Sequence, residues 1–208
     1  MFPDLARDDV FRLETPRLWL RWPRAADAAA IHRYCSRWEV AQYTARIPHP
    51  YPGGTAERFI FAAREGNMSG HDLTLVMTPI RGRREAFGAV SLEGRAQGRL
   101  TLGYALAPEA WGKGLASEAV EAMVEAAFVM TAAVEIVASA RVENPASRRV
   151  LEKAGLEYVA TGLQGAPARG AMTPCDRFRL TRETWNAQRA ALTAQAASIN
   201  RENAHEVP

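Results

Sequence analysis

A glycine-containing turn near the middle of the chain has the residue types that bind phosphate. In the stretch LGYALAPEAWGKGLASEA, residues 102–119, an apolar run ends at a proline, and Gly112-Lys113-Gly114 then opens into an alanine-rich helix. The first N–H groups of a helix have no partner within it, and the helix dipole favours negative charge at that end. Gly114 and Ala116 would let a pyrophosphate approach the backbone closely. We therefore expect an anion-binding turn here.

Two common phosphate-binding motifs do not fit this turn. A P-loop requires Ser or Thr after its Gly-Lys pair, whereas Gly114 follows Lys113 here. A Rossmann motif requires a third glycine at the place that Ser117 occupies. The turn is therefore expected to hold neither a nucleoside triphosphate nor a dinucleotide.

Composition sets the outer limits of the function. The net charge of +3 suits an anionic ligand, but the chain lacks the dense Lys/Arg stripe of nucleic-acid-binding proteins, and a basic surface that only maintains solubility explains the charge at least as well. Cys35 and Cys175 lie far apart, and the four histidines form no metal-ligand pattern. There is no export signal and no apolar run of about 18 residues. We expect a reduced, cytoplasmic protein without a structural metal, which binds neither nucleic acid nor membrane.

Apolar periodicity predicts strands and helices that are interleaved along the chain. Strand-type runs cover residues 17–22, 73–77, 86–92, 100–107, 134–140, 156–160 and 177–181. Helical spacing covers residues 25–35, 55–65, the segment that follows Ser117, and the stretch NPASRRVLEKAG at 144–155. Thr55 is the expected N-cap of the second helix, and Asn144, Pro145 and Gly155 mark the two ends of the last one. This order predicts a mixed sheet flanked by helices.

The domain is expected to span residues 12–181, after an N-terminal arm of residues 1–11. From Arg182 onward the chain is Ala-rich and polar, so residues 182–208 are expected to form a tail that is partly helical or disordered. A terminal helix that makes dimer contacts is the alternative, and both a monomer and a homodimer remain open.

The turn resembles the acetyl-CoA-binding motif of the GNAT N-acetyltransferase superfamily, Gln/Arg-x-x-Gly-x-Gly/Ala, with Trp111 at the Gln/Arg position. The Trp-Gly-Lys-Gly sequence is similar to the branch of ribosomal-protein N-terminal acetyltransferases (RimJ/RimL-like). Four stretches carry this resemblance, namely ETPRLWLR (14–21), WEVAQYT (38–44), GYALAPEAWGKGLASEA (103–119) and NPASRRVLEKAGLEYV (144–159). It implies an α/β (α+β) fold: a mixed, mostly antiparallel sheet of six to seven strands, flanked by about four helices and splayed at the cofactor site.

The resemblance also implies a set of residues that bind acetyl-CoA. The pantetheine arm would lie along the strand at residues 104–106, and an N–H near Leu106 would polarise the thioester carbonyl. Residues of a plain buried strand would look the same, and Asn144 would be favoured as an N-cap in any protein. The implied cofactor-binding residues are Tyr104, Ala105, Leu106, Trp111, Gly112, Lys113, Gly114, Leu115, Ala116, Ser117, Asn144 and Arg149.

The residues at the positions of the general acid and the general base differ from the commonest pattern of the family. A tyrosine acid often stands seven residues after the Asn, where this chain has Leu151, whereas Ser147 matches the serine proposed in the ribosomal-protein branch. A serine in a first helical turn is also ordinary. The resemblance thus implies Ser147, Leu106 and Asn144 as catalytic residues. The usual base, a glutamate, is replaced by Thr101. Glu93 is a substitute candidate by its position on a neighbouring strand, but a solvated carboxylate at a strand end is the stronger interpretation.

The absence of a glutamate base affects which class of amine the protein could acetylate. An α-amine, with a pKa near 7.7–8.0, is partly neutral at neutral pH, whereas a lysine amine with a pKa of about 10.4 is not. A protein or peptide N-terminus is therefore the first expectation for the acceptor. A small amine such as an amino acid, polyamine or antibiotic is the second, and a non-catalytic acyl-CoA-binding module is the third. Trp38, Tyr43 and Thr101 are the expected residues of the acceptor pocket.

Overall fold

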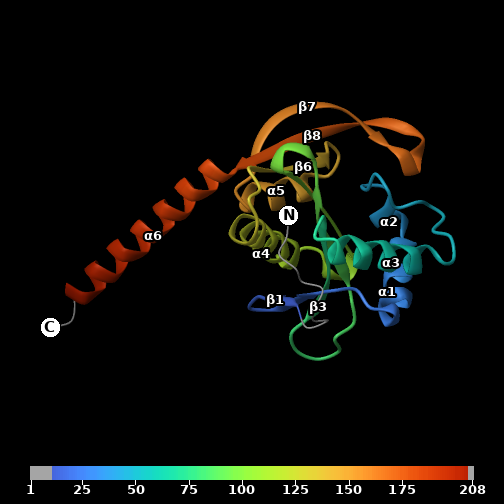
Figure 1. The fold of residues 1–208 in the computed structure, drawn as a ribbon, viewed down its shortest axis with the longest axis horizontal. Helices are drawn as coiled ribbons and strands as arrows, with labels where there is room; N and C mark the ends of the chain where they lie inside the picture. Colours follow the sequence, from blue (N-terminus) through green and yellow to red (C-terminus); the bar gives the residue numbers. More distant parts are fainter. Residues whose placement is uncertain (1–10, 206–208) are drawn as a thin grey trace.

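Eight strands form one sheet in the order β1-β2-β3-β4-β5-β6-β8-β7 in the computed structural model, which describes residues 11–205, with side chains as far as residue 195 (Figure 1). The strands are β1 (Arg12–Glu14), β2 (Leu18–Arg21), β3 (Asp72–Pro79), β4 (Gly88–Gly94), β5 (Arg99–Leu106), β6 (Glu135–Arg141), β7 (Glu157–Ala166) and β8 (Ala171–Thr181). The helices are α1 (Ala28–Cys35), α2 (Trp38–Ala41), α3 (Thr55–Met68), α4 (Leu115–Met130), α5 (Pro145–Lys153) and α6 (Arg182–His205).

All neighbouring strands are antiparallel except β5 and β6, which run parallel. Their pairing begins at Arg99 opposite Glu135 and ends at Thr101 opposite Val137, although both strands continue beyond that point. The sheet therefore splays between the later halves of β5 and β6.

Helices cover both faces of the sheet because side chains alternate along each strand. On β3, Leu75 and Met77 face a core that includes Val120, Met123 and Phe128 of α4, whereas Val76 faces a second core built by α1 and α3. Figure 1 shows α4 and α5 apart from α1, α2 and α3. Helix α4 contacts β5 and α5 contacts β6, the two strands that diverge at the splay.

The α/β class and the mostly antiparallel sheet are confirmed, but the expected counts were low. The sheet has eight strands because β1 adds one that is too short and too charged to show apolar alternation. Strands β7 and β8 also extend into the Gly/Pro-rich segment between the strand-type runs expected at 156–160 and 177–181, since they pair with each other along it. Thr55 is not an N-cap: it is the first helical residue of α3, and Gly54 occupies the N-cap in a left-handed conformation.

The segment after Thr181 forms α6, which leaves the body of the molecule in Figure 1. Its start is held by Arg182, whose guanidinium donates to the carbonyls of Phe128, Thr131 and Ala133 at the end of α4. Trp185 then stacks on Phe128 with ring centroids 5.1 Å apart. The expected arm lies outside the described residues except for Phe11. Within the described part, none of the helices has the length and apolarity that a membrane span requires.

Candidate active site

The later half of β5 presents an unpaired backbone edge toward the splay. The N–H of Ala107 donates to the carbonyl of Phe87 at 2.7 Å, and the N–H of Arg95 donates to the carbonyl of Arg99 at 2.8 Å. Because backbone groups alternate in direction along a strand, odd-numbered residues of β5 face β4. Tyr104 and Leu106 therefore direct their N–H and C=O groups away from β4, into the gap that β6 has left.

The turn after β5 is fastened to this edge by Trp111. Its indole Nε1 donates to the carbonyl oxygen of Leu106 at 3.0 Å, so the strand carbonyl is satisfied while the Leu106 N–H still faces the gap. Gly112 and Gly114 both have a φ of 72°, a left-handed conformation that strongly favours glycine. The Lys113 ammonium donates to the carbonyl of Glu109 at 2.7 Å. Backbone N–H groups at the start of α4 are thereby placed beside the open end of β5.

Thr15 and Arg17, which lie between β1 and β2, form hydrogen bonds with Glu118 in the first turn of α4. Glu118 accepts hydrogen bonds from the Thr15 hydroxyl at 2.5 Å and from the Arg17 backbone N–H at 2.8 Å. The Arg17 side chain reaches both the second Glu118 oxygen, at 2.6 Å from Nε, and the Lys113 carbonyl, at 2.8 Å from Nη1. Partial burial alone would raise the pKa of Glu118, but these donors outweigh it and hold that pKa below its usual value.

Across the gap, the N-terminus of α5 presents the serine that the resemblance implicates. The Asn144 side-chain carbonyl accepts the Ser147 N–H at 3.1 Å, so Asn144 caps α5 as expected. The Ser147 hydroxyl lies 2.8 Å from the phenol oxygen of Tyr104. Burial raises the pKa of Tyr104 to about 12, although the Ser147 hydrogen bond opposes the shift. Tyr104 was expected to serve through its backbone, and its phenol contact with α5 was not foreseen.

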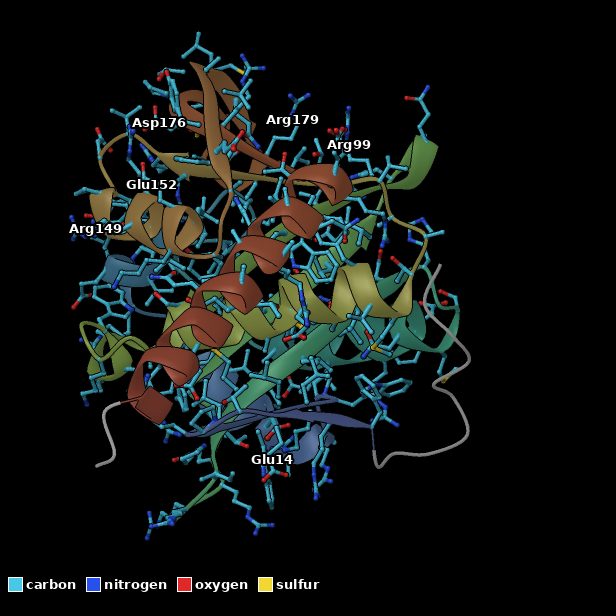
Figure 2. All side chains as sticks on the ribbon, turned by 90° about the vertical axis from the view of Figure 1, so that its left-hand side faces the viewer. Glu14, Arg99, Arg149, Glu152, Asp176 and Arg179 are labelled. Carbon is cyan, nitrogen blue, oxygen red and sulfur yellow. The ribbon has the colours of Figure 1, made fainter. Side chains whose placement is uncertain are left out.

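The remaining expected cofactor residues lie at three different places in the structure. Leu115, Ala116 and Ser117 are half-buried in the first turn of α4, beside the glycine turn. Ala105 instead directs its side chain toward the core on the α1 and α3 face. Arg149 is exposed on α5, near Glu152 (Figure 2).

Two of the three expected acceptor residues, Trp38 and Tyr43, lie in or just after α2, whereas Thr101 lies on β5. Tyr43 lines a small pocket of about 70 Å³ together with Ser139 and Arg141 of β6 and Gln164, Thr173 and Cys175 of the β7–β8 hairpin. Trp38 begins α2, is half exposed, and lies under the Arg169 guanidinium at 5.3 Å from its ring centroid. Arg169 also donates to the carbonyls of Ala41 and Ile47, which ties the loop to the hairpin. Thr101 does not line this pocket.

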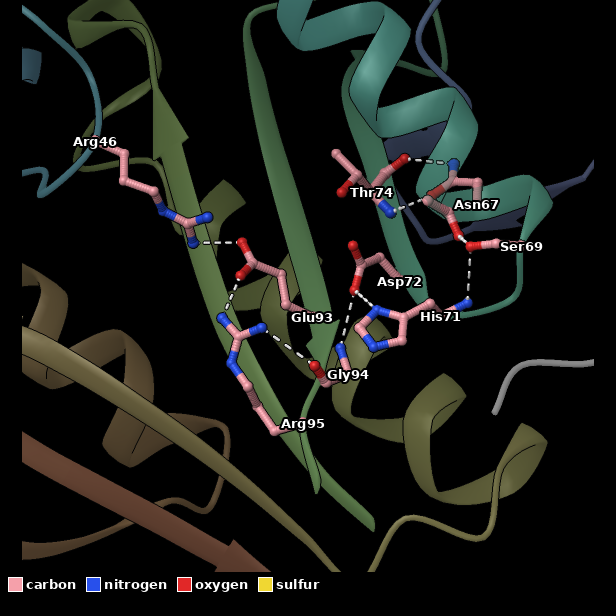
Figure 3. Close-up of polar contacts among 10 residues, drawn as sticks. Arg46, Asn67, Ser69, His71, Asp72, Thr74, Glu93, Gly94 and Arg95 are labelled. Carbon is pink, nitrogen blue, oxygen red and sulfur yellow. Dashed lines mark hydrogen bonds and ion pairs between the residues drawn. The ribbon is translucent and has the colours of Figure 1, made fainter. Parts of the chain in front are cut away.

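Glu93 lies directly across from Thr101 in the register of β4 and β5. Figure 3 shows its carboxylate between two arginines: Arg46 from the loop after α2, and Arg95, whose Nη2 is 2.6 Å away. The two β-strand positions are on the same face of the sheet because they are opposite in an antiparallel pair. The structure therefore brings a carboxylate beside the position where the sequence lacks one.

Among residues 11–195, no group of three or more His, Cys, Asp or Glu side chains is arranged to hold a metal ion. Both cysteines are buried and free. Burial raises the pKa of the Cys35 thiol to about 12, although hydrogen bonds with Tyr51 and Tyr34 act in the opposite direction.

Comparison with known proteins identifies a match between residues 17–157 and the family described as acetyltransferase (GNAT) domain. The FsC-acetyl coenzyme A-N(2)-transacetylase of Aspergillus fumigatus is 33% identical over 89 residues, which are 42% of this chain and only 38% of that protein. The ribosomal-protein-S5-alanine acetyltransferase of Vibrio fischeri is 21% identical, with a TM-score of 0.72 over 84% of this chain and 98% of its own. The spermidine N-acetyltransferase of Vibrio cholerae in complex with CoA and spermine is 17% identical, with a TM-score of 0.68 over 82% of this chain and 99% of its own.

Proposed function

The chain belongs to the GNAT acetyltransferase family, and on that premise we propose that it transfers an acetyl group from acetyl-CoA to a primary amine. The open backbone edge of β5 beside the glycine turn is the observation that carries this proposal. The fit is supported by Gly112 and Gly114, whose left-handed φ of 72° forms the turn that leads into the first N–H groups of α4. Trp111, Gly112, Lys113 and the first turn of α4 would hold the pyrophosphate, and Tyr104 and Leu106 would pair with the pantetheine arm.

Three groups of this chain would act in the transfer. The Leu106 N–H would donate to the thioester carbonyl oxygen as negative charge develops there, a contribution of roughly 3 kcal/mol for a preorganised donor. The amine nitrogen would form the new C–N bond while the C–S electron pair leaves on sulfur. The Ser147 hydroxyl would hydrogen-bond or protonate that sulfur, and Asn144 would hold Ser147 through the N-cap.

A protein or peptide α-amine is the acceptor we propose. Thr101 supplies no carboxylate, and Glu93 is engaged by Arg46 and Arg95, so the proton of the amine would leave through water. An α-amine needs the least help, because a substantial minority is already neutral near pH 7. The exposed loop at Trp38 and Tyr43 would receive the chain end. A small amine is the alternative, and the structural likeness to a spermidine acetyltransferase supports keeping it.

The full chain should be incubated with acetyl-CoA and an acceptor panel while free thiol is measured, with mass spectrometry of the products. The panel should contain peptides with a free α-amine, the same peptides blocked at the N-terminus but carrying lysine, and free amino acids and polyamines. We expect thiol release and acetylation at the α-amine. Acetylation of the small amines alone would replace the proposed acceptor. Thermal stabilisation by acetyl-CoA without thiol release would indicate a binding module instead.

A further inference from the structure

We propose that the phenol of Tyr104 positions the Ser147 hydroxyl toward the sulfur of CoA, in a chain that has Leu151 in place of a tyrosine acid on α5. The inference rests on the proposed acetyl transfer and adds a positioning residue to it. Leu151 is a fully buried core residue, 1% exposed, so α5 itself offers no phenol at that point.

The two residues lie on opposite sides of the splay. Tyr104 belongs to β5 and Ser147 to the first turn of α5, 43 positions later in the chain. The phenol oxygen lies 2.8 Å from Ser147 Oγ and 3.2 Å from the Ser147 carbonyl oxygen. Tyr104 therefore bridges the strand and the helix where β5 and β6 have diverged. The bond fixes Ser147 relative to the backbone groups of β5 that face the gap.

Either hydroxyl can donate in the contact between the Tyr104 phenol and Ser147 Oγ, and the arrangement proposed here has Tyr104 as the donor. The Ser147 carbonyl belongs to the α5 backbone ladder, and the shorter of the two phenol contacts is to Oγ. A phenol hydrogen donated to Oγ leaves the serine's own hydrogen free to point elsewhere. Asn144 already holds the Ser147 backbone through its N–H. In this arrangement the serine hydrogen would point into the gap, toward the place of the CoA sulfur.

The phenol of Tyr104 stays protonated, and can therefore donate a hydrogen bond, over the pH range in which activity would be measured. Because burial raises the pKa of Tyr104 to about 12, the phenol is neutral at neutral and mildly alkaline pH. Tyr104 would therefore lose no proton during transfer. The hydrogen that reaches sulfur would come from Ser147, and Ser147 would recover a proton that the attacking amine sheds to water. The phenol hydrogen bond would stabilise the negative charge that passes over the serine oxygen.

The test compares Tyr104→Phe, Ser147→Ala and the double variant in the full chain. The matched control is Tyr158→Phe, which removes another phenol–hydroxyl contact of 2.8 Å, to Thr161 on the exposed strand β7. We expect Tyr104→Phe to lower kcat about tenfold with the KM for acetyl-CoA changed less than threefold. Because Tyr104 acts through Ser147, the double variant should be no slower than Ser147→Ala. The control should keep the kcat of the parent.

Unchanged kcat in Tyr104→Phe, or single effects that multiply in the double variant, would overturn the inference. A raised KM with unchanged kcat would show that the phenol only packs the cofactor site. A parent protein that acetylates no acceptor would count against the proposed function, and a turnover-independent measurement then decides the inference. The parent should bind CoA several-fold more tightly than desulfo-CoA by calorimetry. Tyr104→Phe and Ser147→Ala should lose this preference and Tyr158→Phe should keep it; its retention in Tyr104→Phe would refute the positioning role.

Discussion

Trp111 donates its indole N–H to the carbonyl oxygen of Leu106 at 3.0 Å and thereby ties the glycine turn to the last residue of β5. The bond holds together two parts of the candidate site that recognise different parts of acetyl-CoA. Leu106 belongs to the open edge, which would face the pantetheine arm and thioester, and Trp111 begins the turn that would face the pyrophosphate. The aromatic residue at the Gln/Arg position of the motif thus has a structural role toward its own strand.

Trp111→Phe should weaken CoA binding about two- to tenfold, because it keeps an aromatic side chain, although a smaller one, but removes a hydrogen bond with a net value of about 0.5–1.5 kcal/mol. Without this hydrogen bond, the Leu106 carbonyl and the end of β5 would no longer be held to the turn. Isothermal titration with CoA measures the effect. Trp185→Phe is the control, since Trp185 packs on Phe128 away from the turn. Equal affinities for Trp111→Phe and the parent would show that the bond does not order the turn.

Gly114→Ala should lose both stability and CoA affinity. The left-handed φ of 72° costs an alanine about 1–2 kcal/mol, and the new methyl group would occupy the space where phosphate must approach the start of α4. Gly82→Ala is the matched control, because Gly82 has a φ of 82° and open space around its Cβ position in the loop between β3 and β4. Chemical denaturation should show a similar loss in both variants, and CoA affinity should fall more than tenfold only in Gly114→Ala. Similar affinity losses in the two would argue against a phosphate site at Gly114.

Glu118→Gln should reduce stability at pH 7 by on the order of 1 kcal/mol, because the charged acceptor of Thr15 and Arg17 is lost. The folded-state pKa of Glu118 is lowered, so its contribution is present above the unfolded pKa near 4.3 and disappears as the pH falls through the folded value. Urea unfolding of the parent and the variant should therefore converge on acidification. Glu125→Gln, which breaks an exposed pair with Arg189, should change stability little at any pH. A Glu118 difference that stays constant down to pH 3 would contradict this linkage.

Glu93→Gln should lower kcat/KM for an α-amine acceptor by less than tenfold, since Glu93 is already engaged by Arg46 and Arg95. Glu135→Gln is the control: its side chain is 14% exposed, against 15% for Glu93, and it pairs with Arg99 at 2.5 Å. A loss of more than a hundredfold in Glu93→Gln alone would assign Glu93 as the general base, because such groups typically contribute 10²- to 10⁴-fold.

Features that depend on neighbouring residues could be predicted well. Asn144, Pro145 and Gly155 mark the ends of α5 because capping uses residues within one turn. The glycine turn before α4 is likewise local. The N-cap of α3 was the exception, because Thr55 and Gly54 are adjacent and both fit the pattern of a helix start.

Features that depend on pairing between distant segments could not be predicted in the same way. The short β1 and the long hairpin of β7 and β8 form because a partner strand lies beside them, although much of β7 is exposed and lacks an apolar pattern. Glu93 could be considered only by its position on a neighbouring strand, and the register then placed it opposite Thr101.

By itself the sequence determined that a helix begins after a glycine turn suited to phosphate, that the chain resembles one acyltransferase family, and that Leu151 and Thr101 replace two of its usual catalytic residues. Only the tertiary structure decided that Tyr104 meets Ser147, that Trp111 closes on Leu106, and that β6 leaves the edge of β5 open. The physical reason is that caps and turns are set by contacts within a few residues. Strand register, splay and helix placement are set by the packing of segments that are tens of residues apart.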